Sequence, residues 1–306
     1  MTKADSPPNL TLAFIALLVG NAALASGPHF VRLADTGPVA AAFWRLALAL
    51  PLLWFFAWRQ SARDATPLLP RGWALVLALA GGLFFAADLA SWHVGILMTK
   101  MANATLFGNT ASLILPLATL IAARRGPSRL EALALGAAIA GAFILMRESS
   151  DAGTARLTGD LLCVLAGVLY AGYMLAMQRA RATLSPWAAL GLATAAGVLP
   201  LLATAAALGE NILPGNWTPL LLLSFTSQIV GQGLLIYALP HFSALVVGLT
   251  LLTQPATAAL IGWLAHGERL SGSDYLGAGL LALALVIIRM PGSGRDGAPS
   301  GAGSNN

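Results

Sequence analysis

Long apolar runs separated by short polar breaks are the main feature of this chain. A helix needs about 20 largely apolar residues to cross a bilayer. The runs therefore predict ten membrane-spanning helices, at residues 10–30, 38–58, 72–98, 102–122, 130–146, 157–178, 186–208, 217–239, 242–265 and 274–290. Because several breaks are only a few residues long, we expect consecutive helices to pack as antiparallel hairpins.

The composition supports this interpretation and excludes a water-soluble globule. Apolar residues make up 58% of the chain and charged residues only 9%, against about 25% charged residues in a typical soluble domain. The expected fold class is therefore an all-α integral membrane protein. A single cysteine, Cys163, excludes an internal disulfide and a multi-cysteine metal site. The basic residues are scattered along the chain, so nucleic-acid binding is not expected.

The loop charges predict how the chain sits in the membrane. Lys and Arg in the short loops concentrate on the side that holds the N-terminus. Cytoplasmic loops carry the excess of these residues in membrane proteins. We therefore expect a multi-pass protein of the inner (plasma) membrane with both termini in the cytoplasm.

The two halves of the chain carry similar landmarks, which predicts an internal duplication. A five-helix unit at residues 10–147 would be followed by a second at 157–290, with a cytoplasmic tail at 1–9 and a disordered tail at 291–306. An odd number of spans makes the second unit enter the bilayer in the opposite sense. The matching landmarks are Gly37-Pro38 with Ser185-Pro186, Pro116 with Pro255, and Gly136 with Gly277.

Inverted repeats of this kind place a solute site near the bilayer midplane, where the two copies meet. Rocking of one copy against the other then opens the site to one side at a time. The alternative, that an alanine- and leucine-rich membrane chain shows such prolines and glycines by chance, stays open at this point.

In these landmarks the chain resembles the drug/metabolite transporter superfamily, in its ten-helix EamA-type branch. The resemblance covers residues 10 to 290 and rests on Gly37-Pro38, Trp44-Arg45, Pro116, Tyr237-Ala238-Leu239, Gln254-Pro255, and Gly267-Glu268-Arg269-Leu270-Ser271 before Gly277. It implies a transporter built from two five-helix repeats. Exporters of amino acids and related metabolites are common in this branch, and the chain is most similar to its YddG-like exporters of aromatic amino acids.

Charged side chains within the spans are the first candidates for the transport site, because polar groups in hydrocarbon normally face a wet or protein-filled interior. Arg45 lies seven residues after Pro38, roughly 10 Å into the helix at ~1.5 Å per residue. It could attract a carboxylate or form a structural pair with Asp88 or backbone carbonyls. Asp88 could bind an ammonium group or a proton, or it could be neutralised by Arg45 or form a hydrogen bond with His93.

The remaining candidates are neutral polar and aromatic side chains. They could line a polar cavity and stack against an apolar solute, or serve as interhelical hydrogen bonds and packing bulk. The expected substrate-binding residues are Asn21, Trp44, Arg45, Asp88, His93, Asn109, Tyr170, Tyr173, Gln228 and Gln232. Glu268 and Arg269, by contrast, are expected to form a helix-end and loop device.

Other chemistry is not indicated. The chain has no phosphate-binding Gly-x-x-x-x-Gly-Lys loop and no spacing of metal ligands. We therefore expect a non-enzyme without cofactor or metal, acting as a monomer or weak homodimer on a small-molecule substrate within the lipid bilayer. The alternatives are a carrier of drugs, sugars or nucleotide-sugars, a lipid flippase, an intramembrane enzyme or a passive channel.

Overall fold

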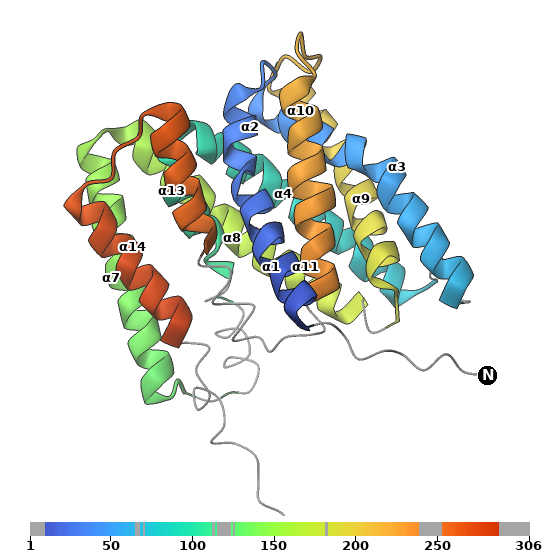
Figure 1. The fold of residues 1–306 in the computed structure, drawn as a ribbon, viewed down its shortest axis with the longest axis horizontal. Coiled ribbons are helices and arrows are strands. Elements are labelled where there is room, and N and C mark those ends of the chain that lie inside the picture. Colours follow the sequence, from blue (N-terminus) through green and yellow to red (C-terminus); the bar gives the residue numbers. More distant parts are fainter. Residues whose placement is uncertain are drawn as a thin grey trace, which may run out of the picture.

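The structure is a computed structural model of the 306-residue chain, and it describes residues 10–64, 68–69, 71–111, 114, 124, 126–180, 183–238 and 253–287. In this part of the chain all regular structure is helical (Figure 1). The helices are α1 (Leu10–Ala25), α2 (Gly27–Leu33), α3 (Pro38–Asp64), α4 (Trp73–Met98), α5 (Met101–Gly108), α7 (Arg129–Asp151), α8 (Thr154–Ala180), α9 (Pro186–Ala207), α10 (Thr218–Leu223), η1 (Ser224–Gly231), α11 (Gln232–Ala238), α13 (Thr253–His266) and α14 (Gly272–Ile287).

Six helical segments of the described chain are long and apolar enough to cross a membrane. They cover residues 10–33, 38–63, 73–98, 154–177, 187–207 and 218–235. The prediction of an all-α membrane protein is thus confirmed at this level. Much of the fourth and ninth predicted spans lies outside the described residues, including Pro116.

Prolines begin two of the long helices, as the sequence predicts. Pro38 is the first residue of α3 and Pro186 the first of α9. Proline is tolerated there because its missing N–H would have no intrahelical partner. Ser185 precedes α9, and its hydroxyl accepts a hydrogen bond from the Ala188 N–H at 3.3 Å. These local signals fix where the two helices start.

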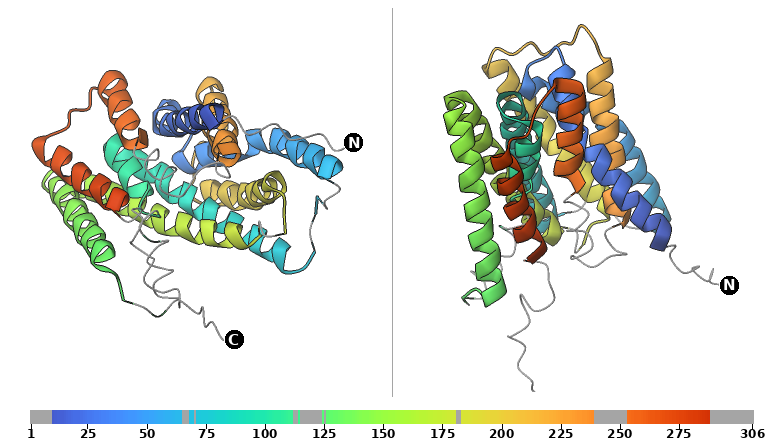
Figure 2. Two further views of the ribbon diagram at one scale, coloured as in Figure 1. Left: turned by 60° about the horizontal axis from the view of Figure 1, so that its bottom comes forward. Right: turned by 60° about the vertical axis from the view of Figure 1, so that its left-hand side comes forward.

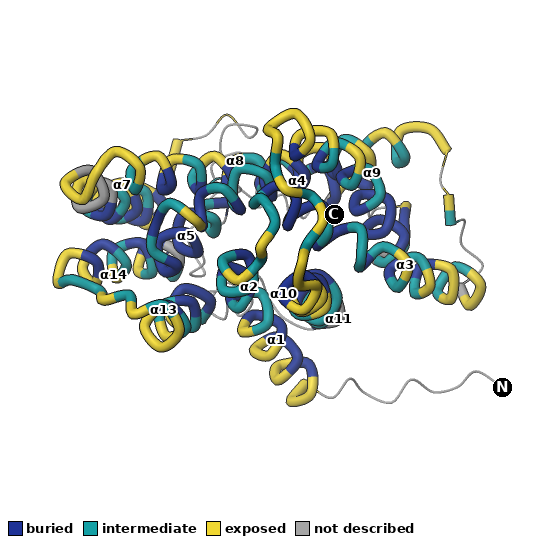
Figure 3. The backbone as a smooth tube through the Cα atoms, turned by 90° about the horizontal axis from the view of Figure 1, so that it is seen from above, coloured by how far each residue is buried: buried dark blue, intermediate teal, exposed yellow. Residues whose placement is uncertain are grey.

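The helices run nearly side by side, and α4 lies at the centre, between α8 and α9 (Figures 1 and 2). Around it, α3 packs on α9 and η1, α1 packs on η1, α11 and α13, and α5 packs on α8 and α13. At one side of the molecule α7 packs along α14. Buried residues face these helix contacts, and exposed residues follow the outer faces (Figure 3).

The hairpin expected between α13 and α14 is absent. Residues 267–271 join α13 to α14 directly, yet the close neighbours of α13 are α5, α1 and α2, whereas α14 packs on α7 and α5. Gly267 has φ +65°, a left-handed turn that suits glycine. The chain then crosses to a separate helix pair, so a short loop does not force its two helices together. The expectation was wrong here because helix packing, not loop length, determines the partner.

Gly141 and Gly277 allow α7 and α14 to approach closely. A Cβ built on Gly141 would lie 2.7 Å from the Gly277 carbonyl oxygen, and one on Gly277 would lie 3.0 Å from that of Gly141. Gly136 and Gly279 on the same two helices have nothing within 4 Å of such a Cβ. Close approach of this kind strengthens van der Waals contact between helices in lipid.

We expect Gly141→Ala to destabilise the protein by about 1–3 kcal/mol, because the added methyl overlaps the backbone of α14 and the two helices must separate. Gly136→Ala is the matched control on the same helix, since its methyl would meet open space. Thermal unfolding in detergent measures both. Equal melting temperatures for the two variants would contradict the close contact.

Candidate functional site

A π-helical turn carries part of the candidate site. Residues Ser224–Gly231 form η1 between α10 and α11, and this segment includes Gln228. Such wide turns are rare and often occur at functional sites. The π-helical turn could not be predicted, because the apolar pattern of this segment is compatible with a regular helix. Gln232 follows at once as the first residue of α11.

Arg45 is buried in the interior of the bundle, with 3% of its surface exposed. Its Nε donates a hydrogen bond to Gln228 Oε1 at 3.2 Å, and its guanidinium carbon lies 6.0 Å from the centre of the Trp92 ring. Among the described residues no hydrogen bond reaches its two Nη groups. The planar end of the guanidinium therefore remains available for a carboxylate, which it matches in geometry.

Asp88 lies close enough to Arg45 for the two charges to interact, and it is 8% exposed. No hydrogen bond joins its carboxylate to another described residue. The predicted alternative of a bond to His93 is not formed; His93 Nδ1 instead lies 3.2 Å from the carbonyl oxygen of Pro38. Tyr170 interacts with both charges and with the side chain of Gln232. We call Arg45, Asp88, Tyr170, Gln228 and Gln232 the central polar cluster.

Several buried polar atoms in the described bundle lack a hydrogen-bond partner. They include His93 Nε2, Gln228 Nε2, Ser227 Oγ and Thr194 Oγ1. A buried polar group without a partner costs about 1–3 kcal/mol, so such groups usually bind water or a ligand. Gln228 and His93 lie beside Arg45, so their unpaired nitrogens indicate a place where a polar guest molecule can be held.

An aromatic group borders the central polar cluster. The rings of Phe85 and Tyr173 stack at 4.7 Å and 22°, and Tyr170 lies 5.5 Å from Tyr173. Tyr170 and Tyr173 were expected here, whereas Phe85 was missed because an apolar residue in an apolar helix carries no signal. Polar and aromatic surfaces thus meet beside one buried pair of charges.

Three other expected residues make their contacts elsewhere. Asn21 donates to Leu17 O at 3.0 Å and accepts from Gln254 Nε2 at 2.7 Å, which joins α1 to α13. The Trp44 indole donates to Ile212 O at 2.7 Å. Asn109 directly follows α5 and is partly exposed. No hydrogen bond between described residues joins these three to the central polar cluster, and their role in binding remains a prediction.

The end of the bundle that holds the α2–α3, α4–α5 and α13–α14 connections is tied by an ion pair. Arg32 Nη1 lies 2.6 Å from Glu268 Oε1, and the Arg32 guanidinium also donates to the carbonyl oxygens of Ile96 and Thr99. The Met101 N–H donates to Glu268 at 3.0 Å. We call Arg32, Glu268 and these backbone groups the latch, and this end of the bundle the latched end.

Further contacts close the latched end. Glu210 accepts hydrogen bonds from the Val39 and Ala40 N–H groups at the start of α3. Lys100 pairs with Asp274, and Thr99 hydrogen-bonds to Asp160. Glu268 was expected to act at a helix end, but its partner Arg32 could not be predicted, because 236 residues separate the two in sequence.

Two histidines meet beside the latch. His29 Nδ1 lies 3.1 Å from His266 Nε2, which joins α2 to the end of α13. Desolvation, and then the positive charges of Arg32 and His29, lower the pKa of His266, while Glu268 raises it to a smaller extent. The neutral imidazole is therefore favoured in this arrangement, because one ring must accept the proton that the other donates.

We expect stability to fall as the pH drops below about 6.5, the ordinary pKa of histidine, because the released His266 binds a proton more readily than the packed one. Above that pH His266 is neutral in both the folded and the unfolded chain, and its packing contributes fully to stability. Thermal unfolding in detergent at pH 7.5 and 5.5 measures this loss of stability. The melting temperature of the His266→Gln variant should fall less between the two pH values than that of the original chain. An identical decline in both would contradict this role.

The described residues hold no group of three or more His, Cys, Asp or Glu side chains that could bind a metal ion.

The comparisons with known proteins agree with a membrane protein. No curated protein matches the sequence. A crystal structure of a protein that is 17% identical shares the fold, with a TM-score of 0.59 over 92% of this chain and 98% of that chain. The sequence model of the EamA-like transporter family matches residues 157–290. Over this stretch, which is less than half of the chain, the sequence is similar to the EamA-like transporters, a membrane-transporter family of the drug/metabolite transporter superfamily.

Proposed function

We propose that the chain is a secondary-active or facilitative carrier that exports amino acids with aromatic or apolar side chains. The observation that carries this proposal is the burial of one positive and one negative side chain, Arg45 and Asp88, next to the Phe85–Tyr173 stack. A zwitterion presents a carboxylate and an ammonium group a short distance apart. The two protein charges match these groups, and the aromatic rings match an apolar side chain.

The helix packing supports two inverted five-helix units within residues 10–147 and 157–290. In this assignment α1, α3, α4, α5 and α7 correspond to α8, α9, the α10–η1–α11 segment, α13 and α14. Each strong contact between the units then has a counterpart. The packing of α4 on α8 matches that of η1 and α11 on α1. The packing of α4 on α9 matches that of η1 on α3, and the packing of α5 on α8 matches that of α13 on α1. The pairs α3–α9, α5–α13 and α7–α14 map onto themselves.

Alternating access follows from this arrangement. The latch closes one end of the bundle. Its two side chains come from different units: Arg32 lies in α2, and Glu268 lies in the α13–α14 connection. We assign the latched end to the outside of an inner membrane and both termini to the cytoplasm, in line with the loop charges. The central polar cluster would then be reached from the cytoplasm when the latch is closed, by a chain that acts as a monomer or weak homodimer.

Exchange of labelled phenylalanine into proteoliposomes tests the proposal. Unlabelled phenylalanine should compete, whereas phenethylamine, which lacks the carboxylate, and phenylpropionate, which lacks the ammonium, should compete at least about tenfold less, because each leaves one buried charge unpaired. Saturation separates a carrier from a channel. No exchange of phenylalanine, together with saturable exchange of a sugar or nucleotide-sugar, would replace the amino-acid assignment with another solute class.

A further inference from the structure

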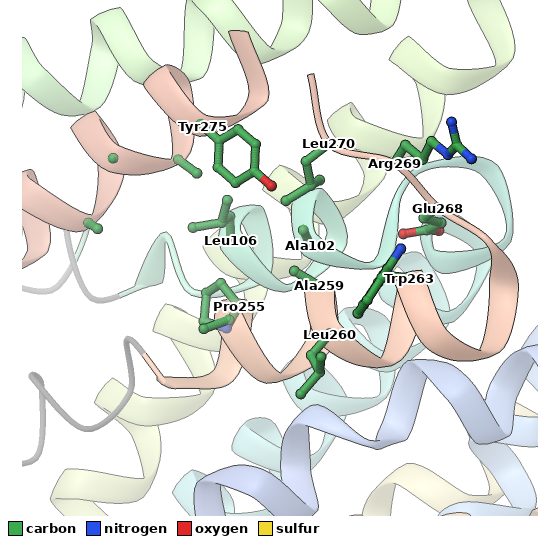
Figure 4. Close-up of a pocket in the computed structure, with 14 residues that line it drawn as sticks. Ala102, Leu106, Pro255, Ala259, Leu260, Trp263, Glu268, Arg269, Leu270 and Tyr275 are labelled. Carbon is green, nitrogen blue, oxygen red and sulfur yellow. The ribbon is translucent and has the colours of Figure 1, made fainter. Parts of the chain in front are cut away.

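A cavity of about 900 Å³ lies between α13 and α14, away from the central polar cluster (Figure 4). These helices diverge from their short connection, and α5 forms the wall between them. Most of the lining is apolar or small, with Ala102 and Leu106 from α5, Ala256 and Ala259 from α13, and Ala278 and Gly279 from α14. A void of this size between helices would leave its lining without contact partners.

The cavity faces the membrane. Leu260, Trp263 and Tyr275 line it and are 52%, 60% and 66% exposed. Trp and Tyr are enriched where the hydrocarbon meets the headgroups. In Figure 4 the Tyr275 ring and the Trp263 ring lie near the α13–α14 connection, while Pro255 lies at the other end of α13. The cavity therefore extends from the interfacial level into the hydrocarbon.

Charge favours a negative group at the interfacial end. Glu268 and Arg269 are the charged side chains in the lining. The Glu268 carboxylate is neutralised by Arg32 and accepts the Met101 N–H, whereas Arg269 is exposed and forms no hydrogen bond or ion pair with a described residue. The net charge left at this end is positive.

We propose that the cavity is a binding site for an anionic glycerophospholipid, with an acyl chain between α13 and α14 and the phosphate beside Arg269. The bilayer supplies such a molecule at this depth, and its apolar chain and negative head match the two ends of the cavity. The lipid fills the space that the diverging helices leave open and so stabilises the second unit from its outer face.

Native mass spectrometry of the detergent-solubilised full chain with equal amounts of phosphatidylglycerol and phosphatidylcholine tests the proposal. We expect retained phosphatidylglycerol, and a preference over phosphatidylcholine that falls about fivefold in Arg269→Gln, the effect of one charge near a headgroup. Arg71→Gln is the matched control, because Arg71 is also exposed in a loop but lies outside the cavity. Equal loss in both variants would overturn the assignment to Arg269.

A second variant tests the position of the acyl chain. Ala259→Trp places a bulky ring inside the cavity and should reduce retention of both lipids while raising the melting temperature in lipid-free detergent. Unchanged lipid retention in this variant would overturn the site. Appearance of a dimer that lipid does not disrupt would show instead that a second copy of the chain covers this face. Monodisperse elution of each variant confirms that it is folded.

Discussion

Arg45→Gln is expected to lower the rate of phenylalanine exchange in proteoliposomes at least about 30-fold, because loss of one partner of a buried charge pair costs about 2–5 kcal/mol. The variant keeps a shorter side chain that can still form hydrogen bonds, but it removes the charge that would hold the solute carboxylate. Asp88→Asn should have an effect of the same order through the ammonium group. Arg179→Gln, which removes an exposed charge at the end of α8, should leave exchange unchanged.

The double variant Arg45→Gln/Asp88→Asn separates binding from a purely structural pair. If the two charges only neutralise each other, their joint removal should restore both thermal stability and exchange. If they hold the solute, stability should recover while exchange stays lost. Recovery of exchange would therefore contradict the proposed role, and the melting temperature of each variant shows whether it is folded.

The sequence predicted the features that depend on local chemistry or on depth in the membrane. Pro38 and Pro186 begin helices for reasons contained in the proline ring, and Arg45 and Asp88 were identified because a charge in an apolar span needs a special environment. In the structure the two side chains lie close enough for their charges to interact. A prediction based on position within a span could not determine that the guanidinium would contact Gln228 rather than a backbone carbonyl.

Features that depend on packing between distant segments were not predictable. The π-helical turn at Ser224–Gly231 and the separation of α13 from α14 follow from neighbouring helices, which leave no mark in the local pattern. The same holds for the partner of Asn21: its depth predicts a polar contact but not that Gln254 of α13 donates to its carbonyl oxygen. Depth identifies polar residues that require a partner, but it does not identify the partner.

Glu268→Gln is expected to open the latched end. The Glu268 carboxylate receives Arg32 and the Met101 N–H, and the exposed fractions of the two charged side chains are only 15% for Arg32 and 14% for Glu268. Loss of this partly buried charge should weaken the closed arrangement by about 2 kcal/mol, less than the 3–5 kcal/mol for a fully buried pair. Since 1.4 kcal/mol is a factor of ten, the open population should rise by roughly 30-fold.

Thiol labelling measures this change. In a Cys163→Ala background, Ser227→Cys places a thiol at a site that is 1% exposed and lies next to Gly27. Gly27 lies roughly 7 Å deeper in the bundle than Arg32, counted along α2 at ~1.5 Å per residue. A water-soluble maleimide should react with it much faster in Glu268→Gln, and Arg32→Gln should match this increase because it breaks the same ion pair.

Glu131→Gln is the control for the latch. It also removes a buried carboxylate that accepts a backbone N–H, from Ser128 at 2.7 Å, but this group lies at the start of α7, at the opposite end of the bundle. Labelling of Ser227→Cys should stay slow in this variant. Fast labelling here, or slow labelling in Glu268→Gln, would mean that the ion pair does not control access. The latch joins α2 to the α13–α14 connection. Faster labelling of Ser227→Cys in Glu268→Gln, but not in Glu131→Gln, therefore requires that these two segments separate when the site opens.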